Sequence, residues 1–336
     1  MPTQTHPGRR ILIGADENGM GPILGPLVVT AVTAEVSAEG ARTVAKPGRR
    51  FEKSIGDSKG LVSFGDGALG EAWARALYRR ETKQSVPSPD ALLHSLFLDS
   101  KEFLREPCPS HHQDMCWNDS SERFTSDDAL VAACEKDLAK LEVKGISIRF
   151  ARTIVVCNQR LNQHAAKGVS RFDVDLHAME RLVLHARKET NDLVRATCGK
   201  VGGFGYYGEK FGPLSGYLHA VVHEDRARSE YSFPGVGEIA FVRDADEKDL
   251  LVGLASLVGK WVRDTLMLRI VRHFRQHNED LPFASGYHDP VTARFIQATK
   301  LVRKREKVDA KCFLRENAAP KAKRAATTSS ARRPKR

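Results

Sequence analysis

The sequence has little that would place it in a membrane or in a disulfide-rich class. No apolar run approaches the roughly 20 residues that a membrane-spanning helix needs, and the first ten residues lack the apolar core of a signal peptide. The 6 cysteines among 336 residues show no short regular spacing, so they do not indicate a disulfide framework. We therefore expect a reduced, cytoplasmic protein without a membrane partner.

Acidic residues are missing from the C-terminal end of the chain. The net charge is +11, and 317–336 contains 7 Lys and Arg residues and no acid, among Ala, Pro, Ser and Thr. This composition is typical of disordered segments. Basic tails add salt-dependent affinity for nucleic acid without reading its sequence. We expect a disordered basic tail of this kind, with a solubilising tail as the alternative.

One segment near the N-terminus combines acids with glycines. An apolar run from Ile11 ends in Asp16 and Glu17, and a turn containing Gly19 and Gly21 leads into a second apolar run. Neighbouring side chains on an ideal strand point to opposite faces, so both acids can share one site only where the strand ends or twists. Glycine permits such a bend. The pattern indicates either a site with two carboxylates beside accessible backbone or a hairpin with an acidic corner.

Apolar patterning along the rest of the chain predicts strands and helices in alternation. Strands are expected over 10–16, 25–36, Ile146–Val156, 193–198 and 237–243. Helices are expected over 70–82, 173–190 and 250–277. The segment 87–143 is predicted as helical pieces around a loop at 106–126, and 215–233 has room for a hairpin. Strand pairs followed by helix–strand alternation predict an α/β domain with a mixed sheet.

Several motifs together resemble one known family, the type 2 ribonucleases H. DENGMGP at 16–22 and GP at 25–26 are similar to the family's D-E-x-G-x-G-P…G-P opening, with methionine where bacterial enzymes usually have arginine. ADEK at 245–248, LASLVGK at 254–260 and RD at 263–264 follow its A-D-x-K…A-S-x-x-A-K-x-x-R-D pattern. The motifs occur in the family's order.

Two shorter segments extend this resemblance. DSKGL at 57–61 resembles the family's D-S-K-K-L, with Gly60 in place of the second lysine, and SGYHDPVT at 285–292 looks like its K-G-Y-G-T segment. The resemblance implies that Lys59 contacts phosphate and that Tyr287 packs on sugar at an RNA–DNA junction. A surface lysine and a core or loop tyrosine are the alternatives.

The resemblance also implies a fold. It covers 9–300 as a ribonuclease-H-like α/β domain of three layers around a five-stranded mixed sheet. The segment 63–145 is longer than the family's equivalent and is expected to be a helical insert. The disordered tail at 317–336 lies outside this domain.

The implied function is a metal-dependent endoribonuclease that cleaves the RNA strand of RNA–DNA hybrids or of ribonucleotide-containing DNA, acting as a monomer. The resemblance implies that three catalytic acids hold Mg²⁺ or Mn²⁺, namely Asp16, Glu17 and Asp246. It implies substrate contacts by Gly19, Gly21, Lys59, Lys260 and Tyr287. Asp264 lies four residues after Lys260, so a simple ion pair is the alternative for that lysine. For Asp246 the alternative is an acid that favours a helix start.

One departure from the family leaves two functions open. The family has a third catalytic aspartate at the end of the strand predicted at 193–198, where this chain has Cys198 or Gly199. Magnesium prefers oxygen ligands, and thiolate is a poor substitute. The chain is therefore either an enzyme with weakened metal binding, which another acid such as Glu209 could assist, or a non-catalytic nucleic-acid-binding protein. An interaction scaffold built on the insert is a third reading.

A cluster of possible zinc ligands lies inside the insert. Cys108, His111, His112 and Cys116 have the spacing C-x2-H-H-x3-C, which matches no standard zinc finger. A structural zinc site and a plain loop both remain open from the sequence.

Overall fold

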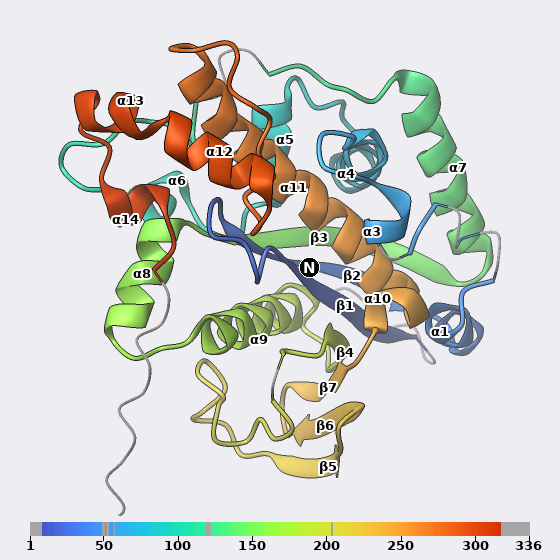
Figure 1. Cartoon of the computed structure of the whole chain (residues 1–336). Coiled ribbons are helices and arrows are strands. Elements are labelled where there is room, and N and C mark those ends of the chain that lie inside the picture. The colour runs from blue at the N-terminus through green and yellow to red at the C-terminus, as the bar shows by residue number, and fades with distance from the viewer. Residues whose placement is uncertain are drawn as a thin grey trace, which may run out of the picture.

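The computed structural model describes residues 9–48, 51, 54–56, 58–118, 122–202 and 204–316, without the side chains of 58 and 59. One sheet is covered by helices on both faces (Figure 1). The strands are β1 (Arg10–Asn18), β2 (Leu27–Val36), β3 (Ile146–Val156), β4 (Val194–Gly199), β5 (Ala220–Glu224), β6 (Arg228–Phe233) and β7 (Gly237–Val242). No helix in this part of the chain is long and apolar enough to cross a membrane. The predicted tail at 317–336 lies outside the described residues.

The helices fall into three groups along the chain. Those before β3 are α1 (Ala38–Ala45), α3 (Ser58–Leu61), α4 (Ala68–Thr82), α5 (Pro89–Leu96), α6 (Lys101–Arg105) and α7 (Asp128–Val143). Between β3 and β4 lie α8 (Asn158–Ala166) and α9 (Arg171–Thr190). After β7 follow α10 (Ala245–Lys248), α11 (Leu250–Arg275), α12 (Pro290–Ala298), α13 (Lys300–Arg305) and α14 (Ala310–Phe313).

The sheet is mixed, as predicted, but it has seven strands in the order β3-β2-β1-β4-β7-β6-β5. β1 pairs antiparallel with β2 and parallel with β4, and β4 pairs parallel with β7. The prediction of five strands is wrong because the β5–β6 hairpin joins the same sheet through antiparallel pairing of β6 with β7. Tyr231 and Phe233 on β6 are buried in the core shared with α9, which holds the hairpin in the sheet.

Alternating side chains divide the core into two layers. Leu12 and Val28 pack with α4 and α11, whereas Ile13 and Val29 pack with α9. Figure 1 shows α9 and α11 on opposite faces of the central strands. The chain therefore has the helix–sheet–helix layering of an α/β domain.

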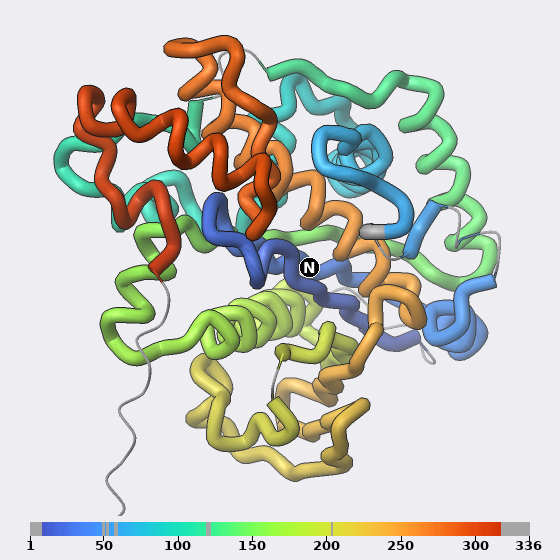
Figure 2. Tube along the Cα trace, viewed as in Figure 1, coloured from blue at the N-terminus to red at the C-terminus, as the bar shows by residue number. Residues whose placement is uncertain are grey.

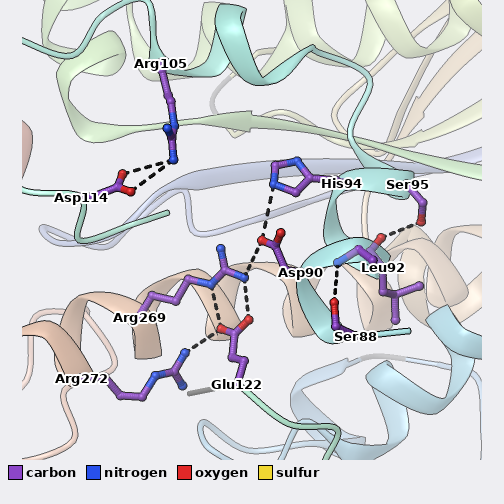
Figure 3. A network of polar contacts seen from close by, with 11 residues as sticks. Ser88, Asp90, Leu92, His94, Ser95, Arg105, Asp114, Glu122, Arg269 and Arg272 are labelled. Carbon is purple, nitrogen blue, oxygen red and sulfur yellow. Dashed lines mark hydrogen bonds and ion pairs between the residues drawn. The ribbon is translucent and has the colours of Figure 1, made fainter. Parts of the chain in front are cut away.

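The segment 63–145 packs directly on α11. Arg269 on α11 is 1% exposed, and its Nη2 lies 2.5 Å from Oε2 of Glu122 and 3.1 Å from Oδ1 of Asp90. Arg272 also pairs with Glu122, at 2.6 Å (Figure 3). These buried charges tie the segment to the central helix. The domain boundaries at 9–300 and 63–145 remain predictions.

The C-terminal helices pack against the connection between β1 and β2. Phe274 on α11 and Phe313 on α14 form a third core cluster with Leu24, which lies in the connection between β1 and β2. The backbone N–H of Arg315 donates to the carbonyl of Ile23 at 2.9 Å. Figure 2 shows the blue N-terminal connection beside the orange and red C-terminal segment. We call this connection, residues 19–26, the glycine turn.

Candidate functional site

Asp16 and Glu17 lie near the C-terminal end of β1. The strand continues past the predicted end at Asp16 to Asn18, and its pairing with β2 continues with it. The two carboxyl groups nevertheless approach one point. A Cβ atom built on Gly199 would lie 2.7 Å from Oδ1 of Asp16 and 3.4 Å from Oε2 of Glu17. Both acids therefore lie beside the end of β4.

Asp16 is the most buried of the three predicted catalytic acids, at 8% exposure. Burial is the main cause that raises the pKa of Asp16, and the negative charges of Glu17 and Asp246 raise it further. A hydrogen bond with the side chain of Ser256 on α11 acts in the opposite direction. Three acidic side chains from β1 and α10 thus share one electrostatic environment, although Asp246 lies far from the other two in the sequence.

The start of α11 explains how Asp246 comes close to β1. A Cβ on Gly14 would lie 2.3 Å from the carbonyl carbon of Leu251, so the glycine lets the first turn of α11 lie directly on β1. Asp249 caps this helix by accepting from the N–H of Leu251 at 2.9 Å. Burial raises the pKa of Asp249 to about 6, although backbone hydrogen bonds and one with Thr197 on β4 stabilise its charge. The Asp249 cap and the packing of α11 on Gly14 hold α10, which carries Asp246, close to β1.

The end of β4 contributes no acid to this group. Cys198 pairs with Ala15 of β1, is 0% exposed and lies in the core shared with α9. The next residue, Gly199, faces the carboxyl groups of Asp16 and Glu17. Of the two positions that the sequence left open, the structure therefore assigns Gly199 to the place beside the acids.

Sequence reasoning missed a fourth acid, Asp175 on α9. Asp175 is 0% exposed, and among the described residues neither of its carboxyl oxygens has a hydrogen-bond partner. Burial, followed by the charge of Asp16, raises the pKa of Asp175. Its position four residues before Met179 places an acid on the apolar stripe of the helix, which is a signal the sequence did contain. Glu209, the acid proposed from the sequence, is exposed, whereas Asp16 is buried.

The glycine turn follows the acids directly. Gly19 has φ +89°, and a Cβ there would lie 2.6 Å from Nε of Arg263, so this position requires glycine. Gly21 is exposed, with nothing within 4 Å of the place where a Cβ would stand. Arg171 and Arg315 donate to carbonyl groups of this turn, which sequence reasoning did not anticipate.

Tyr287 lies next to the same turn. Its ring, 44% exposed, lies 4.8 Å from the guanidinium of Arg263, and Nη2 of Arg263 donates to the carbonyl of Ser285 at 2.8 Å. Lys260 forms the ion pair that the sequence offered as its alternative role, with Nζ 2.6 Å from Oδ2 of Asp264. Gly19 and Tyr287 thus both lie against Arg263.

Two other groups of predicted residues are only partly described or have other contacts. The backbone of Lys59 lies in α3, but its side chain and all of Asp57 lie outside the described residues. In the insert, Nδ1 of His112 contacts the carbonyl of Pro109 at 3.0 Å, and Nε2 of His111 lies 3.4 Å from the carbonyl of Glu306. His112 therefore contacts its own loop, and His111 contacts the backbone that follows α13.

The chemistry of the acidic group fits a hard divalent cation. Asp16, Glu17 and Asp246 offer carboxylate oxygens, which Mg²⁺ and Mn²⁺ prefer. A bound cation would offset the like charges that raise the pKa of Asp16. Throughout the described ranges, however, no three or more His, Cys, Asp or Glu side chains are grouped closely enough to hold a metal ion as they stand. Binding would therefore have to draw the carboxylates closer together.

No family model and no curated protein sequence matches the chain. Among solved structures, ribonuclease HII of Archaeoglobus fulgidus, in a complex with PCNA, is 15% identical with a TM-score of 0.40, over 93% of this chain and 97% of that one. Ribonuclease H2 of Pyrococcus horikoshii OT3 is 14% identical with a TM-score of 0.42, over 90% and 92%.

A third similar structure is Bst-RNase HIII in complex with Mn²⁺, which is 13% identical with a TM-score of 0.36, over 87% of this chain and 71% of that one. Identities and TM-scores this low carry no argument about individual side chains. These three structures are ribonucleases HII, H2 and HIII, and the sequence motifs of this chain resemble the type 2 ribonucleases H.

Proposed function

We propose that this protein is a metal-dependent endoribonuclease that cleaves the RNA strand of RNA–DNA hybrids, or DNA at embedded ribonucleotides, as a cytoplasmic monomer. The observation that carries the proposal is the shared environment of Asp16, Glu17 and Asp246. Burying like charges together is unfavourable, and a bound cation would offset this cost. Groups of this kind are common at functional sites. The glycine turn and Tyr287 lie beside these acids and offer backbone and an aromatic ring to a nucleic acid.

The three acids would hold Mg²⁺ or Mn²⁺ in this proposal. When bound, such an ion supplies charge stabilisation at the scissile phosphate and a water of lowered pKa, and in-line attack leaves a 3′-hydroxyl on the RNA. Gly19 and Gly21 let backbone approach the ribose. Tyr287, supported by the guanidinium of Arg263, offers a flat surface to the sugar at the junction. Lys59 and Lys260 are the proposed phosphate contacts, and Lys260 would have to share its charge with Asp264.

The decisive experiment measures cleavage of a labelled RNA–DNA hybrid against Mg²⁺ and Mn²⁺ concentration. We expect the wild type to cleave at millimolar Mg²⁺ or to prefer Mn²⁺, because β4 provides no acid. Asp16→Asn and Asp246→Asn should abolish cleavage while the fold, followed by circular dichroism, persists. Asp114→Asn, which removes an exposed acid of the insert, is the matched control and should cleave normally.

The presence of Gly199 beside the acids favours one second candidate, a nucleic-acid-binding protein of the same fold without turnover. That candidate predicts hybrid binding by the wild type and by Asp16→Asn alike, with no cleavage at any metal concentration. Robust cleavage at low Mg²⁺ would instead mean that another acid replaces the missing one. If the protein neither cleaves nor binds the hybrid, the interaction-scaffold interpretation remains.

A further inference from the structure

The glycine turn is anchored from behind by an arginine at the end of the described chain. Nη1 of Arg315 donates to the carbonyl of Gly19 at 2.7 Å and lies 3.4 Å from that of Met20. Its Nη2 and Nε donate to the carbonyl of Gly25, at 2.7 and 3.0 Å. One guanidinium therefore bridges the first and second halves of the turn, and its residue is 6% exposed.

The direction of these carbonyls decides where the amides of the turn point. In a planar trans peptide, the C=O of one residue and the N–H of the next point in opposite directions. Because the carbonyls of Gly19 and Met20 point at Arg315, the N–H groups of Met20 and Gly21 point away from it. Within the part of the chain that the structure describes, neither N–H is found donating a hydrogen bond. The exposed Gly21 leaves this side of the turn open.

Two more arginines reinforce the same arrangement. Nη1 of Arg171 lies 3.3 Å from the carbonyl of Met20 and 3.5 Å from that of Pro22, and the buried side chain of Arg263 lies against Gly19. Burial is the main cause that lowers the pKa of Arg315 to about 9, and the charges of Arg263 and Arg171 lower it further. Arg263 is paired with Asp264 at 3.1 Å, so Arg315 and Arg171 are the cations that back the turn, and outward-facing amides in this setting favour an oxygen-rich ligand.

We propose that Arg315 is a positioning residue for ribonucleotide recognition, which holds the glycine turn so that the N–H groups of Met20 and Gly21 face the substrate. The inference rests on the proposed function and goes beyond it, because it assigns specificity to a residue that no family motif of this sequence contains. The methionine at position 20 brings no charge of its own to the turn. Arg315 and Arg171 supply cationic groups from behind it instead.

The chemistry of the guanidinium makes this role testable by a conservative change. Arginine presents several donors in a rigid fork, whereas lysine is a point charge. Arg315→Lys keeps the positive charge but cannot bridge the carbonyls of Gly19 and Gly25 together. Arg303→Lys is the matched control, because Arg303 bonds Ile296 and stacks on Phe313 in the same C-terminal region without touching the turn.

The experiment compares the affinity of each variant for a DNA duplex carrying one ribonucleotide with its affinity for the same all-DNA duplex, in EDTA. Thermal unfolding of each variant is recorded in parallel, and KM and kcat are measured with Mn²⁺. Arg315→Lys should lower the ratio of the two affinities about tenfold, as expected for the loss of charge-assisted hydrogen bonds that orient the turn. We expect KM to rise more than kcat falls, and Arg303→Lys to keep the wild-type ratio.

The outcomes separate this inference from the proposed function. An unchanged ratio for Arg315→Lys, or equal losses for both variants, would overturn the positioning role and leave the proposed function standing. A wild type that binds the two duplexes equally and cleaves neither would overturn the proposed function, and this inference with it. A lower ratio for Arg315→Lys alone, at a melting temperature no lower than that of Arg303→Lys, would support the role.

Discussion

A side chain at position 199 would meet Asp16, since a Cβ on Gly199 would lie 2.7 Å from Oδ1 of that acid. The neighbouring Cys198 points the other way, into the core shared with α9. The two positions that the sequence could not tell apart therefore have different surroundings. Position 199 is the one where a new carboxylate would meet Asp16 and Glu17 directly.

We predict that Gly199→Asp makes the protein depend on a divalent cation for stability. A third carboxylate crowded against Asp16 and Glu17 should lower the melting temperature in EDTA, and Mn²⁺ or Mg²⁺ should restore it by neutralising the group. The comparison is the metal-induced shift in melting temperature for the variant and the wild type. Equal shifts in both proteins would contradict the assignment of position 199.

Cys198→Asp is the contrasting variant. It would place a carboxyl at a buried position, where burial, followed by the charges of Asp175 and Asp16, already raises the pKa of the Cys198 thiol. We expect it to destabilise the protein by about 3 kcal/mol or more, with no recovery on adding metal. Chemical denaturation in EDTA and in Mn²⁺ checks both statements. A metal-dependent rescue of this variant would mean that position 198 faces the site after all.

Removing charge from the acidic group should have the opposite effect on the metal-free protein. Asp246 is one of the charges that raise the pKa of Asp16. Asp246→Asn should therefore stabilise the protein in EDTA by about 1 kcal/mol and abolish most of the stabilisation by Mn²⁺. Asp244→Asn, an exposed neighbour, is the control. A variant that binds Mn²⁺ as tightly as the wild type in calorimetry would exclude Asp246 as a ligand.

The pH dependence of stability should contain a contribution from Glu180. This residue is 1% exposed and accepts from the N–H groups of Gly212 and Leu214, and burial raises its pKa from 4.5 to about 7. Between these values the folded state keeps a proton that the unfolded state has lost, so stability falls as pH rises. The loss should be on the order of 2 kcal/mol.

Glu180→Gln tests this contribution because an amide oxygen can still accept both bonds. Urea unfolding from pH 4.5 to 7.5 should show a flatter profile for this variant than for the wild type. Glu189→Gln changes an exposed acid on the same helix and should leave the profile unchanged. Parallel profiles for the wild type and Glu180→Gln would show that Glu180 is ionised throughout this range.

The buried ion pair between the insert and α11 should contribute more to the free energy of unfolding than an exposed ion pair nearby. Glu122→Gln removes the main charge partner of Arg269, which is 1% exposed, and should cost about 3 kcal/mol. Asp114→Asn breaks the pair with Arg105, in which both side chains are about half exposed, and should cost less than about 1 kcal/mol. Both pairs appear in Figure 3. Equal effects in urea unfolding would mean that the insert is not held to α11 in this way.

The basic tail gives a prediction from the sequence alone. Deleting 317–336 removes 7 cations and should weaken nucleic-acid binding while leaving the preferred substrate unchanged. The plot of log affinity against log salt should become less steep. An identical slope for the full chain and the truncated chain would show that the tail does not contact phosphate.

Local patterning predicted the regular elements well where burial decides them. The strand Ile146–Val156 was predicted with its observed bounds, because its apolar residues alternate and then run together between α9 and the helices α4 and α7. The predicted helix over 173–190 begins two residues earlier, at Arg171, because Ser170 and Asp173 form a capping box there. Such capping residues lie within one turn of the helix start and can be identified in the sequence.

Contacts between distant segments were not predictable in the same way. The hairpin within 215–233 was expected, but its pairing with β7 depends on a long-range register that periodicity does not encode. Motif order led to the expectation that Asp16, Glu17 and Asp246 converge, and the charges of Glu17 and Asp246 both act on Asp16. Motifs do not include Asp175, whose signal is an acid on an apolar helix stripe, or Arg315, which acquires its surroundings through tertiary packing.

The large sequence separation between Arg315 and Gly19 also determines when this contact can form during synthesis. Its bond to Gly19 joins residues 296 positions apart, so the chain cannot close this contact until nearly all of it has left the ribosome. Contacts of such high sequence separation form late and slowly. On the proposed function, a nascent chain that ends before residue 315 would carry Asp16, Glu17 and Asp246 without the guanidinium that holds the adjoining turn. Such a chain would bind a ribonucleotide-containing duplex and an all-DNA duplex with more similar affinities than the full-length protein does.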